Sequence, residues 1–370
     1  MRKIIILIIT VCLALSLVVT GCDSDPEPVG SESAGVEPNG PEPALVEPAG
    51  VVNVHNWGEY IDESIFRIFE EETGIRVNYS TFETNEQIYS LLRMGGANID
   101  VIIPSDYMIA RMIDEDMLEE LDFNNIPNFA LIDERYKGLD FDPDDRFSVA
   151  YKTGTIGLIY NSAMITEEIT SWSALFDERF EGQILMFDNP RDAFGIALKY
   201  LGYYTNTTNE NELHEAFDLL VSQRPILQAY VMDQIFDKLE SGEAWIGPYY
   251  AGDFLTMVEN NPDLAFARPR EGTNFFVDSM CIPAGAQNKL NAEIFINFMI
   301  RTDIALMNME YVMYASANYE AAEIFADQIE PWQYEIIFAG YDVIANSTVF
   351  THLPENILEL YDELWIQLKR

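Results

Sequence analysis

The chain has 370 residues, and its 62 Asp and Glu against 21 Lys and Arg give a formal net charge of -41. Such a charge argues against nucleic acid and anionic lipid surfaces as partners, because both repel it and the chain has no basic run to offer them. Hydrophobic residues make up 48% of the chain, so it can bury a large core. The length fits two lobes better than one domain of about 100–150 residues.

The N-terminal segment, residues 1–21, predicts a bacterial lipoprotein signal peptide. Arg2 and Lys3 precede an apolar run up to Val19, which is typical of secretory signals. The run is long enough to span a bilayer, so a retained anchor helix is the alternative. The end of the run, Val19-Thr20-Gly21-Cys22, resembles the bacterial lipobox, and this resemblance implies cleavage before Cys22 and lipidation of Cys22.

Residues 22–50 predict an extended tether. Within them, residues 23–50 hold seven acids and six of the 17 prolines. A segment so charged and stiff cannot bury a core, so we expect the folded part to begin near Val51.

The cysteines predict no disulfide. Cys12 would leave with the signal peptide and Cys22 would carry lipid, so only Cys281 is left. One cysteine can form neither an intramolecular bridge nor a cysteine metal site. Because Cys281 lies in an apolar run, we expect it in the core.

From residue 51 on, short β-branched runs alternate with helical patterns, which predicts an α/β fold with largely parallel sheets. The first expected elements are a strand over 51–54, a loop over 56–60, a helix from the N-cap Asp62 to Gly74, and a strand over 75–79. Thr84 and Gln87 have the spacing of a capping box for a second helix, which we expect to end at Gly95-Gly96.

The loops that follow predicted strands are rich in aromatic, hydroxyl and acidic side chains. These strands cover residues 100–103, 184–187, 244–247 and 275–280. Parallel strands end at one edge of their sheet, where α/β proteins bind ligands. We therefore expect Trp57 and Ser105, each in a loop after a strand, at the same edge.

Several short motifs occur in a fixed order between residues 51 and 370. They are Asn56-Trp57-Gly58-Glu59-Tyr60, Thr73-Gly74-Ile75-Arg76-Val77, Pro104-Ser105-Asp106-Tyr107, Thr170-Ser171-Trp172-Ser173-Ala174-Leu175 and Val277-Asp278-Ser279-Met280-Cys281-Ile282-Pro283. Each is weak alone, but in this order they resemble the spermidine/putrescine-binding extracytoplasmic proteins of ABC polyamine importers. The resemblance implies a two-lobed α/β fold, the periplasmic-binding-protein type II fold, with hinge strands and a ligand cleft between the lobes. It places lobe 1 at residues 51–155 plus 277–324 and lobe 2 at 156–276 plus 325–370.

A polyamine is an apolar rod that carries ammonium groups. Its site needs aromatic faces for the methylenes and carboxylates spaced like the nitrogens. Carried over position by position, the resemblance implies ten ligand-binding residues. They are Trp57, Tyr60, Ser105, Tyr107, Asn189, Asp192, Tyr250, Phe276, Asp278 and Tyr314.

The chain departs from this family at several positions, including Thr351 where relatives carry Gln. Gly58 stands where relatives often carry Thr, Asn189 where a spermidine binder has an acid, and Tyr250 and Phe276 where relatives have Trp. The aromatic wall is thus kept in kind, but one hydroxyl and one acid are missing.

Asp192 and Asp278 are then the two clear acids, which favours a diamine such as putrescine, with spermidine close behind. Asp106 or Glu83 are candidates for a further charge. Asp192 follows a proline before an apolar run, so a helix N-cap is its alternative role.

Other functions stay open from the sequence. A surface hydrolase has no motif support, since His55, His214 and His352 are scattered and no H-E-x-x-H or G-x-S-x-G occurs. The same fold could bind another organic cation or small ligand, or could serve a sensor. We expect a monomeric, lipid-anchored extracytoplasmic binding protein, without catalysis, metal or cofactor, that delivers a polyamine to the permease subunits of an ABC transporter.

Overall fold

The computed structural model describes residues 50–95, 98–340, 343 and 345–370. The predicted signal peptide, Cys22 and nearly all of the predicted tether lie outside the described residues. None of the described helices is long and apolar enough to cross a membrane.

Ten strands form one mixed sheet. They are β1 (Gly50–Trp57), β2 (Ile75–Phe82), β3 (Val101–Ile102), β4 (Ser148–Asn161), β5 (Ile184–Phe187), β6 (Leu227–Val231), β7 (Ile246–Tyr250), β8 (Leu264–Ala267), β9 (Phe275–Cys281) and β10 (Ala315–Ser316). The main path runs β2-β1-β3-β9-β4-β7-β5-β6, and β8 and β10 each pair with β4. β1 pairs in parallel with β2 and β3, and β5 with β6 and β7. The predicted α/β class is confirmed, but the expectation of largely parallel strands is wrong, because β4 pairs antiparallel with β7, β8, β9 and β10, and β3 pairs antiparallel with β9.

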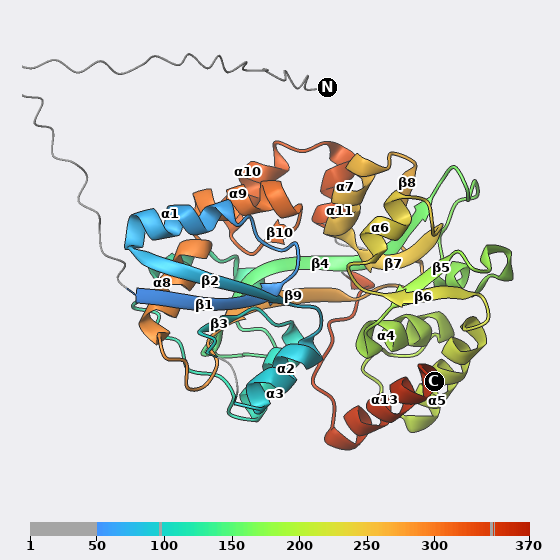
Figure 1. Ribbon diagram of the computed structural model, residues 1–370, viewed down its shortest axis with the longest axis horizontal. Helices are drawn as coiled ribbons and strands as arrows, with labels where there is room; N and C mark the ends of the chain where they lie inside the picture. The colour runs from blue at the N-terminus through green and yellow to red at the C-terminus, as the bar shows by residue number, and fades with distance from the viewer. Residues whose placement is uncertain (1–49, 96–97, 341–342, 344) are drawn as a thin grey trace, which may run out of the picture. The chain divides into compact units, whose positions relative to one another are not determined.

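The long strand β4 joins two halves of the sheet (Figure 1). Its residues 148–155 pair with β9, and residues 156–161 pair with β7 and β8. We call β1, β2, β3 and β9 the first half, and β5, β6, β7 and β8 the second half.

Helices cover both sides of the sheet, with α1 and α7 on one side and α3 and α4 on the other in Figure 1. The α-helices are α1 (Ser64–Thr73), α2 (Asn85–Arg93), α3 (Asp106–Asp114), α4 (Pro190–Leu201), α5 (Glu210–Gln223), α6 (Ile235–Glu240), α7 (Ala251–Asn260), α8 (Lys289–Met299), α9 (Thr302–Val312), α10 (Tyr319–Ala326), α11 (Pro331–Ile337) and α13 (Glu355–Leu368). Short 3-10 helices are η1 (Pro127–Leu131), η2 (Glu134–Tyr136), η3 (Trp172–Phe176) and η4 (Glu178–Phe180).

The helix ends agree only in part with the sequence. Gly74 ends α1 in the left-handed conformation, with φ 71°, and Thr84 caps α2 by accepting from the Gln87 N–H, as predicted. The predicted N-cap Asp62 is wrong, because Glu63 holds that position. The Gln87 side chain accepts from the backbone N–H of residue 83 instead of the cap residue, so the capping box is incomplete. α2 also ends earlier than expected, at residue 93.

Each half of the sheet has its own hydrophobic core. One cluster packs β5, β7, α4, α5 and α13, and two others pack β1, β3, β9, α1, α3 and α8. Cys281 is a free thiol that is fully buried in the core of the first half, as expected.

Replacing Trp172 with alanine is expected to lower the free energy of unfolding by about 3–5 kcal/mol. Trp172 is fully buried, and its indole Nε1 donates to the Gly272 carbonyl over 2.9 Å. Urea unfolding measures the loss. The control is Trp332→Ala, because Trp332 is 48% exposed and its loss should change the unfolding free energy by about 0.5 kcal/mol at most. Equal effects of the two substitutions would contradict the packing described.

Candidate ligand-binding site

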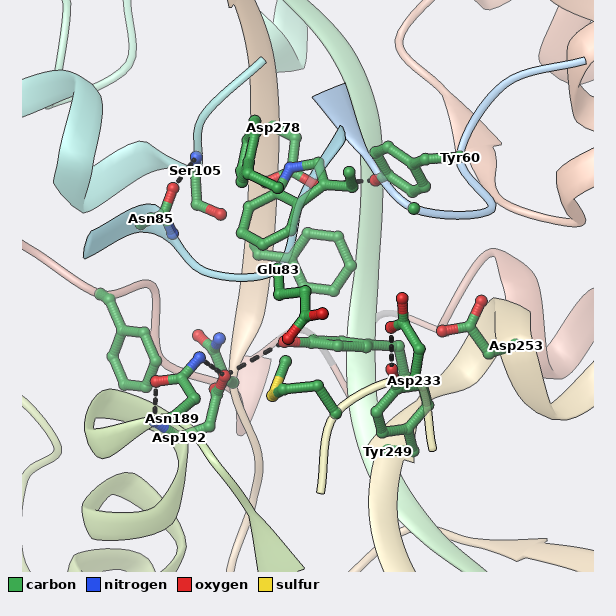
Figure 2. Close-up of a pocket in the computed structure, with 18 of the residues that line it drawn as sticks. Tyr60, Glu83, Asn85, Ser105, Asn189, Asp192, Asp233, Tyr249, Asp253 and Asp278 are labelled. Atoms are coloured by element: carbon green, nitrogen blue, oxygen red, sulfur yellow. Dashed lines mark hydrogen bonds between the residues drawn. The ribbon is translucent and has the colours of Figure 1, made fainter. Parts of the chain in front are cut away.

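One cavity lies beside β4 and β9, with walls from both halves of the sheet (Figure 2). It encloses about 710 Å³ of space free of protein atoms, including its open mouth. All ten residues predicted to bind ligand line this cavity. The structure thus brings them together, while their contact with a ligand stays a prediction.

The first-half wall is built by the ends of two neighbouring parallel strands. β1 extends through Trp57, which was expected in a loop, and Ser105 precedes α3 just after β3. Because β1 and β3 are parallel, both residues reach the same edge, as predicted. The Trp57 ring lies 4.5 Å from the Phe82 ring, and its buried Nε1 has no partner among the described residues.

Asp278 of β9 forms one acidic position of the cavity. Its side chain is 4% exposed, and its Oδ2 accepts a hydrogen bond of 2.8 Å from the Tyr60 hydroxyl. Burial raises the pKa of Asp278 to about 6, against the lowering effect of the nearby Ser105 hydroxyl and of the hydrogen bond from Tyr60. Oδ1 has no hydrogen-bond partner among the described residues. This oxygen is free for a donor from a ligand.

Asp192, in the first turn of α4, forms a second acidic position. It is 4% exposed, and its Oδ2 accepts from Asn189 Nδ2 over 2.9 Å and from the Tyr250 hydroxyl over 3.2 Å. Oδ1 has no partner among the described residues. Burial raises the pKa of Asp192 to about 7. The N-cap of α4 is Asn189, whose side chain accepts from the backbone N–H groups of Arg191 and Asp192, so the alternative role for Asp192 is wrong.

Four other acidic side chains also line the cavity, including both of the candidates for a further charge that the sequence offered. They are Glu83, Asp106, Asp233 and Asp253. Asp106 is held by the backbone, because its oxygens accept from the N–H groups of Tyr107 and Val277. Burial raises the pKa of Asp106 to about 8.

Asp233 and Asp253 form a third acidic position, away from Asp192 in Figure 2. Asp233 follows β6, and its Oδ1 accepts from the Tyr249 hydroxyl over 2.9 Å. Burial raises the pKa of the half-buried Asp253 to about 8, and the nearby Asp233 and Glu59 charges add to the shift. A Cβ at Gly58 would lie 2.7 Å from Asp233 Oδ2. Gly58, which lacks the hydroxyl of the threonine that relatives often carry, thus makes room for Asp233 from the second half of the sheet.

Aromatic rings connect these acidic positions. Ring centroids lie 5.6 Å apart for Tyr250 and Phe276, 6.3 Å for Phe276 and Tyr314, and 5.1 Å for Tyr314 and Tyr60. The sequence missed the further lining residues Phe82, Asn85, Met232, Tyr249, Asn274 and Phe350. Of these, Tyr249 stands next to Tyr250 in the sequence, but which of the two side chains faces the cavity depends on the strand register.

The described lining contains no cationic side chain. Within the described ranges, no group of three or more His, Cys, Asp or Glu side chains is placed to hold a metal ion. No Lys, Arg or His lines the cavity. An apolar, aromatic wall with separated carboxylates is suited to a ligand with several positive charges.

Residues 64–338 match the family model of the bacterial extracellular solute-binding proteins, and the chain belongs to this family. The predicted fold class is confirmed by solved structures with the same periplasmic-binding-protein fold. The chain is 36% identical to a Listeria monocytogenes protein provisionally assigned as a spermidine/putrescine ABC transporter, with a TM-score of 0.81 over 86% of this chain and 98% of the other. It is 32% identical to the spermidine/putrescine ABC transporter substrate-binding protein of Streptococcus pneumoniae, with a TM-score of 0.73 over 87% and 99% of the two chains.

A comparison of sequences also finds similarity to a spermidine/putrescine-binding protein. The spermidine/putrescine-binding periplasmic protein of Salmonella typhimurium is 33% identical over 278 residues, which cover 74% of this chain and 80% of the relative. These proteins are solute-binding components of transport systems, and none is described as an enzyme.

Proposed function

We propose that this protein binds a polyamine outside the cytoplasm and delivers it to the permease of an ABC transporter. One observation carries the proposal: Asp192 and Asp278 are buried carboxylates in one aromatic cavity, and each keeps one oxygen without a partner among the described residues. A buried carboxylate is costly without a charged partner. Ligand ammonium groups would supply two such partners.

The names of the relatives support the ligand class and the transport role. Lipid attachment through Cys22, a monomeric state and two lobes that close on the ligand belong to the same proposal. Closure would follow from contacts that the ligand makes with both halves only in the closed state. The ten lining residues predicted from the sequence are the proposed ligand contacts.

The third acidic position changes the expected ligand preference. Two acids alone favoured putrescine. With Asp233 and Asp253 in the same cavity, an amine chain has charged partners at three places. We therefore expect spermidine, with three amines, to bind more tightly than putrescine.

Calorimetric titration of the purified protein with putrescine, spermidine and spermine tests this function. We expect one-to-one saturation with a dissociation constant of about 1 μM or lower for the preferred amine. Arginine and glycine betaine serve as controls, and moderate salt suppresses weak attraction of polycations to the acidic surface. Saturable binding of glycine betaine but of no polyamine would assign the site to another organic cation. Absence of binding by every amine would refute the proposal. Loss of polyamine import on deletion of the gene would distinguish a role in transport from a role in sensing.

A further inference from the structure

Arg191 is a buried cation next to the cavity but is not part of its lining. The residue is 3% exposed. Its Nη2 donates to Asn206 Oδ1 over 3.0 Å and to the Thr351 carbonyl over 3.4 Å. Nε and Nη1 have no partner among the described residues. Burying unpartnered donors costs free energy, so a purely structural role explains this residue poorly.

Three aromatic rings from separate parts of the fold surround the guanidinium. Its carbon lies 5.0 Å from the ring centroid of Tyr107, 4.7 Å from that of Phe350 and 5.5 Å from that of Tyr361. Tyr107 belongs to α3, beside the first half, whereas Tyr361 belongs to α13, which packs on α4 and α5. Aromatic faces attract a cation, so they hold this charge in place beside Asp192.

The charges around Asp192 come from several elements. Glu86 faces it from α2 and Tyr107 from α3, and Tyr250 faces it from β7 and Asn274 from just before β9. Burial is the main cause that raises the pKa of Asp192. The Tyr250 hydrogen bond lowers this pKa, the Glu86 charge raises it, and the Arg191 charge and the nearby Asn274 side chain lower it.

Among these groups Glu86 carries the same charge as Asp192, and it is half-buried. Its Oε1 accepts from the Tyr107 hydroxyl over 3.0 Å, and its Oε2 has no partner among the described residues. Arg191 lowers the pKa of Glu86 as well, and among the described residues it forms no salt bridge with either carboxyl. The guanidinium therefore acts on both acids through space.

We propose that Arg191 is a positioning residue of the ligand site: its caged guanidinium stabilises the Asp192 carboxylate through space and leaves Asp192 Oδ1 free for a ligand ammonium. A direct bidentate pair would also stabilise the carboxylate, but it would occupy both oxygens. The inference rests on the proposed function, because it needs an amine at Asp192.

The test is the affinity for spermidine between about pH 5.5 and pH 8.5 for the wild type, Arg191→Met and Arg191→Lys. Without the cation, Asp192 keeps its proton to a higher pH, so we expect Arg191→Met to move the fall in affinity upward by about half a pH unit or more. Arg191→Lys keeps the charge and should restore the wild-type profile. Arg268→Met is the matched control, because Arg268 is half-buried over Phe266 outside the cavity lining and should leave the profile unchanged.

A loss of affinity of the same size at every pH, without rescue by lysine, would overturn the inference and leave a structural role. If Arg191→Met does not fold, Asn206→Asp offers a second variant, because it keeps the acceptor for Arg191 Nη2 and adds an opposing charge. An unchanged pH profile in Asn206→Asp would also overturn the inference. Failure of the wild type to bind any amine would instead refute the proposed function, and this result is obtained before any variant is compared.

Discussion

Asp278→Asn is expected to weaken spermidine binding by about 100-fold or more. Asp278 is 4% exposed. Its Oδ1 has no partner among the described residues, and this oxygen is the proposed contact for the ligand. The amide keeps the size of the side chain but removes its negative charge. A ligand ammonium would then be desolvated without a charged partner, which is strongly unfavourable in a buried site.

The same substitution should leave the ligand-free protein at least as stable as the wild type. Burial makes the charge of Asp278 unfavourable, as its raised pKa of about 6 indicates, and an amide can still accept from the Tyr60 hydroxyl. Calorimetric titration and thermal unfolding measure the two effects. Asp218→Asn, at an exposed position of α5, is the matched control and should change neither. An Asp278→Asn affinity within about threefold of the wild type would remove this carboxylate from the site.

Lowering the pH from about 8 to about 6 is expected to weaken amine binding by about 1,000-fold. Burial raises the pKa of Asp278 to about 6, of Asp192 to about 7 and of Asp253 to about 8. A carboxyl must lose its proton before it pairs with an ammonium, so each protonated group reduces the affinity about tenfold for every pH unit below its pKa. Calorimetry in buffers with different enthalpies of ionisation should also show that binding releases protons.

The stability of the ligand-free protein should change in the opposite direction. These acids have raised pKa values in the folded state, so between about pH 4 and pH 8 the folded protein binds more protons than the unfolded chain. The stabilisation is complete below the unfolded pKa and is lost as the pH rises through the folded values. Thermal unfolding without ligand should therefore occur at a higher temperature at pH 6 than at pH 8. A melting temperature that rises toward pH 8, together with a flat affinity profile, would contradict the buried acidic site.

The loop positions of the site could be predicted from the sequence because parallel strands end at one edge. Trp57 and Ser105 follow strand patterns that are readable locally, and the resemblance to a family added Asp278 and Tyr314. The cap of α4 was also readable in principle. Pro190 is favoured at the first helical position, which places the cap one residue earlier, at Asn189, and leaves Asp192 inside the first turn.

The third acidic position could not be predicted because it depends on contacts between segments far apart in the chain. Asp233 follows β6, which the sequence did not predict, and nothing near it in the sequence signals a ligand. Its place in the cavity depends on the missing side chain at Gly58, on the opposite wall. From the sequence alone, Gly58 indicated only that a hydroxyl present in relatives is missing. The cage around Arg191 likewise joins α3, α4 and α13, and no local pattern indicates it.

A crystal structure of the protein with spermidine tests the central claim most directly, which is that the two unpartnered carboxylate oxygens bind the amines of one ligand. We expect one ammonium nitrogen at about 3 Å from Asp192 Oδ1, another nitrogen at the same distance from Asp278 Oδ1, and the methylenes between the aromatic rings. Spermidine bound elsewhere on the acidic surface, with this cavity empty at saturating ligand, would contradict the claim.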